Sequence, residues 1–430
     1  VTRSFPPEVG GMQNLMWGLA NSISKYYLTK VFADYQKNHQ EFDGKVSFSI
    51  ERIGGVKLLR KYRKAYLIND FIKKNKKIEC IIADHWKSLE LIKSNKKKIC
   101  LIHSKEINHN KRSRLNNRVL NVLNNVDHII SNSEYTKNLA IQNGVNSEKI
   151  IVINPGVYPA KLIDKKILDK ADNLLKNNKP RLITVSRLDK RKNHEKIIMA
   201  LRNLKQIYPD IIYTCIGYGE EEENIKKLIK ELNLEEQVLF LRNISQDLKN
   251  ALVAKSNIFV MPSIVYKKSV EGFGIAYIEA AQYGIPSIGG KDGGAADAII
   301  HDKTGIIVDG NNLDDVYSSI VDLLTENKFI EFGKAAKDNS NNFHWDNVIQ
   351  KYIKILKKYQ FPSSFWGGGS QKSIYFFCRP IFFGRVEKKS GHQYRSISFL
   401  RIEWEHSQPL KTTLKYSSDR GRGGSDFARF

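Results

Sequence analysis

Cysteine is scarce in this sequence, and its spacing excludes two kinds of site. The 430 residues hold four cysteines, Cys80, Cys100, Cys215 and Cys378. No two of them lie at the short spacing of a zinc site, and a chain of this length does not need a disulfide framework to fold. We therefore predict free, buried thiols in a reducing cytoplasm and no metal site.

Long apolar runs are also absent. No run reaches the roughly eighteen residues that a membrane-spanning helix needs, so we predict a cytoplasmic protein. The chain starts at Val1 and leads directly to Phe5-Pro6-Pro7, which reads as a strand whose beginning is missing. A removed signal peptide therefore stays open as an alternative.

Acidic residues are few relative to basic ones. Asp and Glu total 45 against 70 Lys and Arg, which gives a formal net charge of +25. Such a balance is typical of proteins that bind nucleic acid or an anionic membrane. However, lysine occurs together with asparagine and isoleucine, as in 73–77 and 93–98. We interpret the charge as compositional drift over the whole surface and expect no nucleic-acid partner.

Short apolar runs alternate with helix-length segments along most of the chain. The candidate strands are 78–83, 98–102, 128–131, 150–153, 181–185, 211–216, 238–241, 258–261, 287–289 and 305–308. Runs that are apolar on both faces predict parallel sheets covered by helices. The pattern restarts at a linker near 154–159, so we predict an α/β protein with two Rossmann-like, doubly wound domains across a cleft. Ligands are then expected at the carboxyl ends of the strands.

The composition also indicates where the domains end. Asparagine is absent after residue 360, arginine outnumbers lysine there, and glycine clusters at 367–369 and 420–424. A basic Gly/Arg tail is one interpretation, with RNA as its ligand; a foreign or out-of-frame, largely disordered extension fits the break better. The predicted parts are an N-terminal domain (1–157), a C-terminal domain (158–345), a terminal helix packing back toward the N-terminal domain (346–360) and an atypical tail (361–430).

Two carboxylates eight positions apart, Glu271 and Glu279, carry the most specific signal. Gly272 and Gly274 permit close approach of the backbone, and Ile275 begins a segment without helix breakers. A helix that starts behind a glycine turn presents free N–H groups and a positive dipole end, which suits a phosphate. Glu279, about one turn into the helix, then faces the sugar hydroxyls of the same ligand. A nucleotide sugar is the ligand that this pattern indicates.

Basic residues follow the first strand of the second domain. Arg187 and Lys192 lie just beyond 181–185 and beside the next helix start, where cations are placed to hold a diphosphate leaving group. The alternative is a solvated turn that is basic only because much of this surface is.

Glycines recur downstream at 284–294. Gly284 and Pro286 are interpreted as ordinary turn residues after a helix. Gly293 and Gly294 are predicted to let a loop lie against the ligand.

The first domain offers weaker candidates. Gly10 and Gly11 stand between the opening segment and a helix predicted from Gln13 to Ser24, and their N–H groups are placed to face a phosphate; a simple strand–helix turn is the alternative. His103 directly follows the strand 98–102 and so projects at the ligand edge of the sheet. His85 has the same position after 78–83 with less support, and a structural hydrogen bond is the competing role for either histidine.

These motifs together resemble the retaining glycosyltransferases of family 4, which have the GT-B fold. The shared pattern is Arg187 with Lys192, Glu271-Gly-Phe-Gly followed by Glu279, Gly284-x-Pro286 and then Gly293-Gly294. The likeness covers roughly residues 1–358, and it implies that 1–157 is the acceptor domain and 158–345 the nucleotide-sugar donor domain. The details around Val270 and Ile288 look most like members that use GDP-mannose, such as phosphatidylinositol mannosyltransferases.

The resemblance implies roles for individual residues. Glu279 would hold the nucleotide ribose; Glu271 with the backbone of Phe273, Gly274 and Ile275 would contact the donor sugar and phosphate; Arg187 and Lys192 would bind the diphosphate; Gly10 and Gly11 would line the cleft; and His103 would lie near the transferred sugar.

The resemblance also implies the reaction. A hexosyl unit, in one version mannose, would move from a nucleoside-diphosphate sugar, GDP-mannose or a UDP-sugar, to a lipid-linked or saccharide acceptor. The product would belong to glycan, lipopolysaccharide or glycolipid biosynthesis. The donor is a substrate and not a permanently bound cofactor, and no metal would be required.

One segment, 56–68, bears on membrane binding. Its leucine, tyrosine and isoleucine residues interleave with five cations at roughly helical spacing. A basic amphipathic helix can lie on an anionic bilayer, which would place the protein peripherally on the inner face of the cytoplasmic membrane. A packed surface helix with lysines from compositional drift is the alternative.

Three other functions remain open at this point. A sugar-nucleotide epimerase would share the GT-B architecture but not the paired basic and acidic motifs. A basic RNA-binding protein would explain the charge and the tail but not the ordered motifs. An inactive GT-B fragment would explain both atypical ends.

Overall fold

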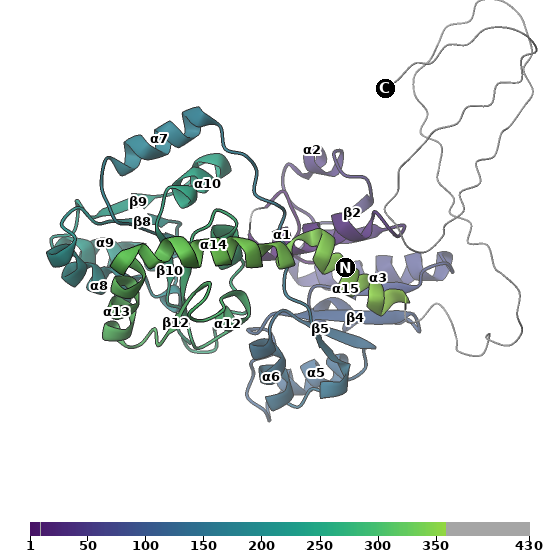
Figure 1. Cartoon of the computed structure of the whole chain (residues 1–430). Coiled ribbons are helices and arrows are strands. Elements are labelled where there is room, and N and C mark those ends of the chain that lie inside the picture. The colour runs from purple at the N-terminus through teal and green to yellow at the C-terminus, as the bar shows by residue number, and fades with distance from the viewer. Residues whose placement is uncertain (9, 358–430) are drawn as a thin grey trace, which may run out of the picture. The chain divides into compact units, whose positions relative to one another are not determined.

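The computed structural model describes residues 1–8 and 10–357, except for the side chain of Lys57. The predicted tail, 361–430, lies outside these residues, as does Cys378. The remainder forms a first lobe and a second lobe, each built around parallel strands (Figure 1).

The first lobe has a four-stranded sheet in the order β3-β4-β5-β6 and a separate pair, β1-β2. Every pairing is parallel. Its elements are α1 (Gly11–Ile23), β1 (Lys30–Asp34), α2 (His39–Asp43), β2 (Ser49–Ile53), α3 (Lys57–Lys74), β3 (Cys80–Ala83), α4 (Trp86–Leu89), β4 (Lys97–Ile102), α5 (Arg114–Leu123), β5 (His128–Ser131), α6 (Glu134–Gln142) and β6 (Ile150–Val152).

The second lobe has one six-stranded parallel sheet in the order β12-β11-β10-β7-β8-β9. Its elements, with the helices that follow, are α7 (Lys165–Leu175), β7 (Arg181–Val185), α8 (His194–Ile207), β8 (Ile212–Ile216), α9 (Glu222–Glu231), β9 (Val238–Leu241), α10 (Gln246–Ala254), β10 (Ile258–Met261), α11 (Ile275–Ala281), β11 (Ser287–Gly290), α12 (Ala295–Ala298), β12 (Gly305–Val308), α13 (Leu313–Leu324), α14 (Lys328–Ser340) and α15 (Trp345–Lys357).

The predicted α/β class with two doubly wound lobes is confirmed, because helices cover both faces of the large sheet. One apolar cluster joins the strands to α7, α10 and α11, and another joins them to α8, α9 and α13. Figure 1 shows α7 and α10 together on one side of these strands. Each of the ten predicted strands corresponds to one observed strand.

Two strands, β1 and β2, were not predicted from the sequence. The burial of β2 is only partial along its first four residues, so it lacks the fully apolar run that marks the other strands. Residues 1 and 2 lie between β1 and β3 without forming a strand: Thr2 N donates to Phe32 O at 2.9 Å, and Asp84 N donates to Val1 O at 3.1 Å. The predicted opening strand is therefore reduced to this short link between the two sheets.

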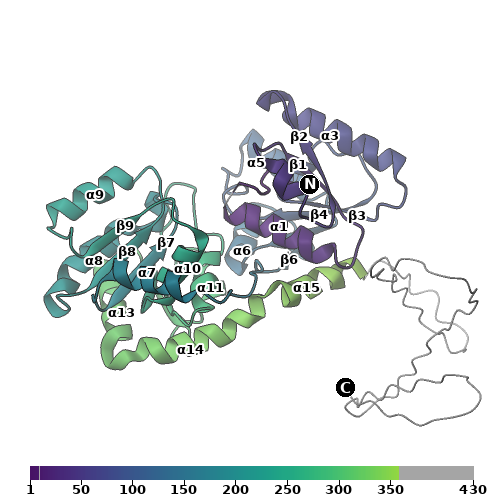
Figure 2. The same cartoon turned by 90° about the horizontal axis from the view of Figure 1, so that it is seen from above.

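The final helix, α15, packs against the first lobe. Trp345, Val348 and Tyr352 are buried in a cluster with Leu15 and Leu19 of α1, and Figure 2 shows the two helices near each other. A Cβ on Gly18 would collide with the ring of Trp345. Because Gly18 has no side chain, the indole of Trp345 packs directly against the backbone of α1.

Candidate functional site

The side chain of Glu271 lies between two basic side chains from the loop after β7. Arg191 Nη1 is 2.7 Å from Glu271 Oε2, and Lys192 Nζ forms an ion pair with the same oxygen. Both cations belong to one short 3-10 turn, Lys190–Lys192, directly before α8. The three side chains are between 9 and 12% exposed, so the ion pairs are largely shielded from water.

The charges of this group are unequal. Asp189 adds a second carboxylate, 3.6 Å from Arg191 Nη2 and 3.0 Å from Arg187 Nη2. We call Arg187, Asp189, Arg191, Lys192 and Glu271 the charge cluster. Its three cations and two carboxylates leave an excess positive charge, which suits an anionic ligand.

The cations fix the ionisation of Glu271. Burial by itself raises the pKa of a carboxyl group. Here the Lys192 ammonium and the Arg191 guanidinium outweigh burial and lower the pKa of Glu271 to about 2. Glu271 is therefore an anion throughout the physiological pH range.

Glycines bring three backbone segments together beside Glu271. Gly294 N donates to Glu271 O at 2.8 Å, and Gly293 forms an isolated parallel β-bridge with Glu271. A Cβ on Gly272 would collide with the carbonyl oxygen of His103, and a Cβ on Gly294 would collide with the carbonyl oxygen of Gly272. Only glycine fits at these two positions, because the backbone itself fills the space that a side chain needs.

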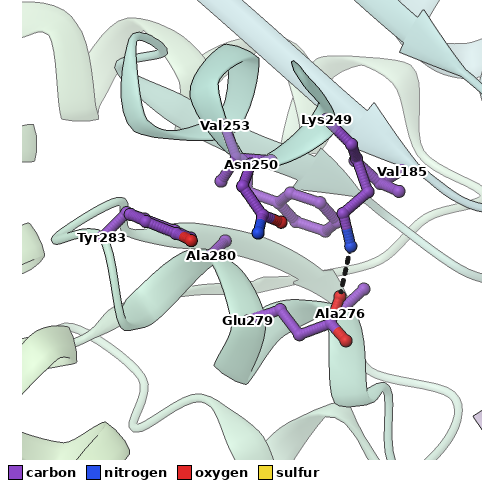
Figure 3. Close-up of a pocket in the computed structure, with 9 residues that line it drawn as sticks. Val185, Lys249, Asn250, Val253, Ala276, Glu279, Ala280 and Tyr283 are labelled. Atoms are coloured by element: carbon purple, nitrogen blue, oxygen red, sulfur yellow. Dashed lines mark hydrogen bonds and ion pairs between the residues drawn. The ribbon is translucent and has the colours of Figure 1, made fainter. Parts of the chain in front are cut away.

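Glu279 is more exposed than Glu271 and lies within a helix. Gly274, with φ 87°, occupies the left-handed region just before α11, and Glu279 follows about one turn into that helix. Its Oε2 is 3.2 Å from Lys249 Nζ of α10, and 37% of its side chain is exposed. Figure 3 shows this ion pair at the edge of a small cavity, with Tyr283 on another side.

The cavity beside Glu279 is too small for a nucleoside as it stands. Its volume is about 10 Å³, which admits roughly one water molecule. Val185, Phe259, Ala276 and Ala280 contribute apolar atoms to its wall. Any ligand that reaches Glu279 therefore contacts its exposed side and does not enter the core.

The structure does not bring Arg187 to Glu271. The Arg187 side chain is 71% exposed and pairs with Asp189. Lys192, the other predicted diphosphate residue, is buried on Glu271. Phe273 turns its ring into the core, 5.6 Å from the ring of Phe343, and the ligand contact expected of the 273–275 backbone stays a prediction.

In the first lobe, His103 directly follows β4 as expected. Its Nε2 lies 3.1 Å from the carbonyl oxygen of Asp84, and its own carbonyl oxygen is the group against Gly272. This contact puts His103 beside the loop that carries Glu271. His85 caps α4 instead: its Nδ1 accepts from Lys87 N at 2.9 Å, and burial lowers its pKa to about 3. The structural role weighed for His85 is the one observed.

Gly10 and Gly11 stand at the start of α1. Gly10 is the residue before the helix, with an extended φ of 169°, and Gly11 is its first residue. A Cβ on Gly11 would have no heavy atom within 4 Å. Their predicted phosphate contact stays a prediction.

Sequence reasoning missed Arg191 and Lys249. Arg191 stands between two other basic residues, Lys190 and Lys192. No periodicity in the sequence shows which of these side chains are buried. Lys249 lies 30 residues from Glu279 in the chain, so only the packing of α10 against α11 brings them together. The one available signal was the helical spacing of Leu248 and Leu252, both buried.

The described residues contain neither a metal-binding group of side chains nor a membrane-spanning helix. Among residues 1–8 and 10–357, no group of three or more His, Cys, Asp or Glu side chains is arranged to hold a metal ion. No helix in this part of the chain is both long enough and apolar enough to cross a membrane.

Comparison with protein families gives two matches. Residues 165–342 match the family described as Glycosyl transferases group 1, and residues 9–161 match the family described as Glycosyltransferase Family 4. Together they cover both lobes.

Comparison with individual proteins also finds glycosyltransferases. A protein of Mycolicibacterium smegmatis named GDP-mannose-dependent alpha-(1-6)-phosphatidylinositol monomannoside mannosyltransferase is 25% identical over 363 residues, which are 80% of this chain and 92% of that protein. An uncharacterized glycosyltransferase of Methanocaldococcus jannaschii is 29% identical over 54% of this chain and 58% of its own length.

Solved structures share the fold. The crystal structure of Anabaena HepE in complex with UDP superposes with a TM-score of 0.70 at 18% identity, over 83% of this chain and 99% of that one. Sucrose-phosphate synthase from Thermosynechococcus elongatus superposes with a TM-score of 0.66 at 18% identity, over 81% and 94%. These likenesses confirm the predicted GT-B fold.

Proposed function

Because this chain belongs to the glycosyltransferases of group 1 and family 4, and has their GT-B fold, we propose that it transfers a hexosyl unit from a nucleoside-diphosphate sugar with retention of configuration. The acceptor is a lipid-linked group or a saccharide. The observation that carries the proposal is the charge cluster around Glu271, which holds excess positive charge next to the close backbone contacts of Gly272 and Gly294.

The charge cluster supplies what the leaving group needs. Breaking the bond to the anomeric carbon puts negative charge on the departing diphosphate. Lys192 and Arg191 are already held in place by Glu271, so they need no rearrangement as that charge develops. Preorganised cations of this kind each contribute about 3 kcal/mol to transition-state stabilisation.

The two acidic residues have separate tasks. Glu271 is ionised and directs the cations, and the backbone beside it contacts the donor sugar. Glu279 is half-exposed, so its free oxygen accepts hydrogen bonds from the ribose hydroxyls. His103, next to Gly272, lies on the acceptor side of the transferred sugar. The leaving phosphate takes the acceptor's proton on the same face, which gives retention.

The names of the relatives support a proposal for the donor base and sugar. The Mycolicibacterium relative is named as GDP-mannose-dependent, while the Anabaena protein was crystallised with UDP and with UDP-glucose. We propose GDP-mannose as the donor and UDP-sugars as its competitors. The proposed reaction uses no metal, because the excess positive charge of the charge cluster offsets part of the negative charge of the diphosphate.

The test is a donor screen followed by product analysis. Thermal shift with GDP-mannose, UDP-glucose, UDP-GlcNAc and UDP-galactose should show one stabilising donor, and the effect should persist in EDTA. NMR of the product made from that donor should show the anomeric configuration of the donor. An inverted product would overturn the retaining assignment, and binding without any transfer would favour an inactive GT-B protein.

A further inference from the structure

A chain of hydrogen bonds runs from the loop after β7 into the core of the second lobe. Ser186 Oγ is 3.0 Å from His194 Nε2, and His194 Nδ1 is 2.8 Å from Tyr213 Oη. Tyr213 Oη donates to Thr184 Oγ1 at 2.9 Å, and Thr184 Oγ1 donates to the carbonyl oxygen of Val260. His194, Tyr213 and Thr184 are each 2% exposed or less. Only the Ser186 end of the chain therefore meets solvent.

The buried end fixes the direction of every proton in this chain. A carbonyl oxygen only accepts, so Thr184 donates to Val260 and its own oxygen accepts from Tyr213. The single hydroxyl proton of Tyr213 is thereby used, and its oxygen accepts from His194 Nδ1. The ring of His194 is therefore protonated at Nδ1. In a neutral ring Nε2 is then an acceptor.

The ring of His194 is neutral at physiological pH. Burial, and then the positive charge of Lys192, lowers the pKa of His194 to about 3. Nε2 consequently accepts the hydroxyl proton of Ser186. The competing acceptor for this proton is Arg187 O, 3.1 Å from Ser186 Oγ. It lies in an exposed stretch, where water replaces the hydroxyl, whereas the buried Nε2 depends on Ser186.

Ser186 lies where a ligand of this sheet is expected. It directly follows β7, with β8 and β9 on one side of that strand and β10 beginning the other half of the sheet. Ligands of doubly wound sheets bind at such a switch point, beyond the carboxyl ends of the strands. Val185 before it lines the cavity beside Glu279 (Figure 3), and Arg187 after it belongs to the charge cluster. Ser186 is partly exposed between them.

Backbone contacts hold both ends of this loop in place. A Cβ on Gly217 would collide with the carbonyl oxygen of Ser186, so the loop after β7 lies directly against the loop after β8. At the other end, the Nδ2 of Asn193 donates to two carbonyl oxygens at 3.0 and 2.7 Å. His194 follows Asn193 and joins this end to Ser186. The position of the hydroxyl is therefore set before a ligand binds.

A hydroxyl group whose proton is already used presents only lone pairs to a ligand. Such an oxygen repels phosphate oxygens and accepts a hydrogen bond from an O–H group. A nucleotide sugar carries phosphate oxygens on its diphosphate and hydroxyl groups on its ribose and its hexose. Ser186 suits one of these hydroxyl groups, while the cations of the charge cluster suit the diphosphate.

We propose that Ser186 is a specificity-determining residue of the donor site, which accepts a hydrogen bond from a hydroxyl group of the nucleotide sugar. Thr184, Tyr213 and His194 are positioning residues, because together they keep the Ser186 proton directed away from the ligand. The inference rests on the proposed function, since it requires a nucleotide sugar at this edge of the sheet.

The first test determines the protonation of His194 and needs no donor. In wild type labelled with nitrogen-15 histidine, NMR at pH 7 should show a neutral ring protonated at Nδ1, assigned by the signal that His194→Gln removes. Thr184→Val should move this proton to Nε2, because the Tyr213 proton then turns to Nδ1. A wild-type ring protonated at Nε2, or at both nitrogens, would overturn the proposal.

The neighbouring strand β8 offers a matched control for Thr184→Val. Thr214 is equally buried, and its hydroxyl forms no hydrogen bond with any described residue. Thr214→Val therefore makes the same change of side chain outside the hydrogen-bond chain. It should leave both the tautomer of His194 and the donor KM, the latter within about twofold, as in wild type.

Donor kinetics test the ligand contact itself. Ser186→Ala should raise the donor KM roughly five- to tenfold and leave kcat near wild type, as expected for the loss of one neutral hydrogen bond. Thr184→Val should raise KM roughly threefold or more by itself but add nothing in the Ser186→Ala background, because it acts through the Ser186 proton. A purely structural role would give additive effects, and that result would overturn the proposal.

Nucleotide affinities identify the hydroxyl group and separate the two proposals. A loss in Ser186→Ala that is equal for GDP and GDP-mannose assigns the contact to the ribose, and a loss confined to GDP-mannose assigns it to the hexose. Wild type that binds no nucleotide or nucleotide sugar would refute the proposed function and the contact with it. Donor binding and KM that are unchanged in Ser186→Ala would refute the contact alone.

Discussion

Glu271 and Glu279 lie eight residues apart, yet their surroundings differ in almost every respect. Glu271 is 12% exposed and contacts two cations from another loop. Glu279 is 37% exposed and contacts one lysine from a neighbouring helix. The first is fixed before any ligand arrives, whereas the second keeps one oxygen available to solvent.

From this difference we predict that Glu271 acts in the transition state and Glu279 in donor binding. A buried, fully paired charge is costly to disturb, so its removal should affect both folding and catalysis. A half-exposed pair contributes little to stability, so its removal should affect ligand affinity alone. The predictions below use this contrast, beginning with the largest effect.

Glu271→Gln should reduce kcat by roughly 100- to 1,000-fold, because Lys192 and Arg191 lose the carboxylate that orients them. The free energy of unfolding should also fall by about 3 kcal/mol, since Lys192 loses its ion pair and Arg191 keeps only the more distant carboxylate of Asp189. Steady-state kinetics and urea denaturation measure the two effects. Glu231→Gln, at an exposed position of α9, is the control and should change neither; wild-type turnover in the Glu271 variant would disprove the assignment.

Acid should remove the stability that Glu271 supplies. Its pKa is about 2 in the folded protein against an ordinary value of 4.5. Because the folded-state pKa is the lower one, the contribution is fully present above pH 4.5 and disappears as the pH falls from 4.5 to 2, by about 3 kcal/mol. Urea denaturation of wild type and Glu271→Gln should therefore converge over that range. Parallel pH profiles for the two proteins would contradict the depressed pKa.

Glu279→Gln should raise the KM for the donor roughly tenfold and leave kcat near wild type, as expected for binding that is uniform between ground and transition states. Unfolding free energy should change by no more than about 0.5 kcal/mol. A donor with 2′-deoxyribose gives the sharper readout. Wild type should discriminate against it, and the variant should discriminate less. Equal discrimination by both proteins would mean that Glu279 does not contact the ribose.

Lys249→Met should have the smallest effect, a rise in donor KM of roughly three- to fivefold, because it frees the Glu279 carboxylate to rotate without removing it. Lys249→Arg keeps the charge and should retain wild-type KM within about twofold. If methionine and arginine have the same effect, the ion pair in Figure 3 does not position Glu279.

The fold was largely predictable from the sequence because most of its strands contain a run of consecutive apolar residues that the lobe buries. Strand β2 was missed for the opposite reason, since it is partly exposed and reads as a polar loop. The separate peptide link at Thr2 has no sequence signature at all, as it depends on two backbone hydrogen bonds to distant strands.

The candidate site was predictable only in part. Glycine and glutamate spacing indicated the segment 271–279, because local geometry there depends on neighbours in the chain. The choice among Arg187, Arg191 and Lys192 was not predictable, since all three are basic residues of one loop and only tertiary packing decides which are buried. Lys249 was not predictable either, because its ion pair with Glu279 joins two different helices.

Gly272 and Gly294 have a consequence for how this chain can evolve. Lysine and asparagine recur along this sequence, and replacements of such residues cost little where side chains face water. At these two glycines a single added methyl group meets a carbonyl oxygen, so no mutational pressure on composition can rewrite them without losing the loop. They should therefore persist in descendants of this sequence long after its lysines have changed, and their loss would mark a lineage in which the close contacts around Glu271 are no longer under selection.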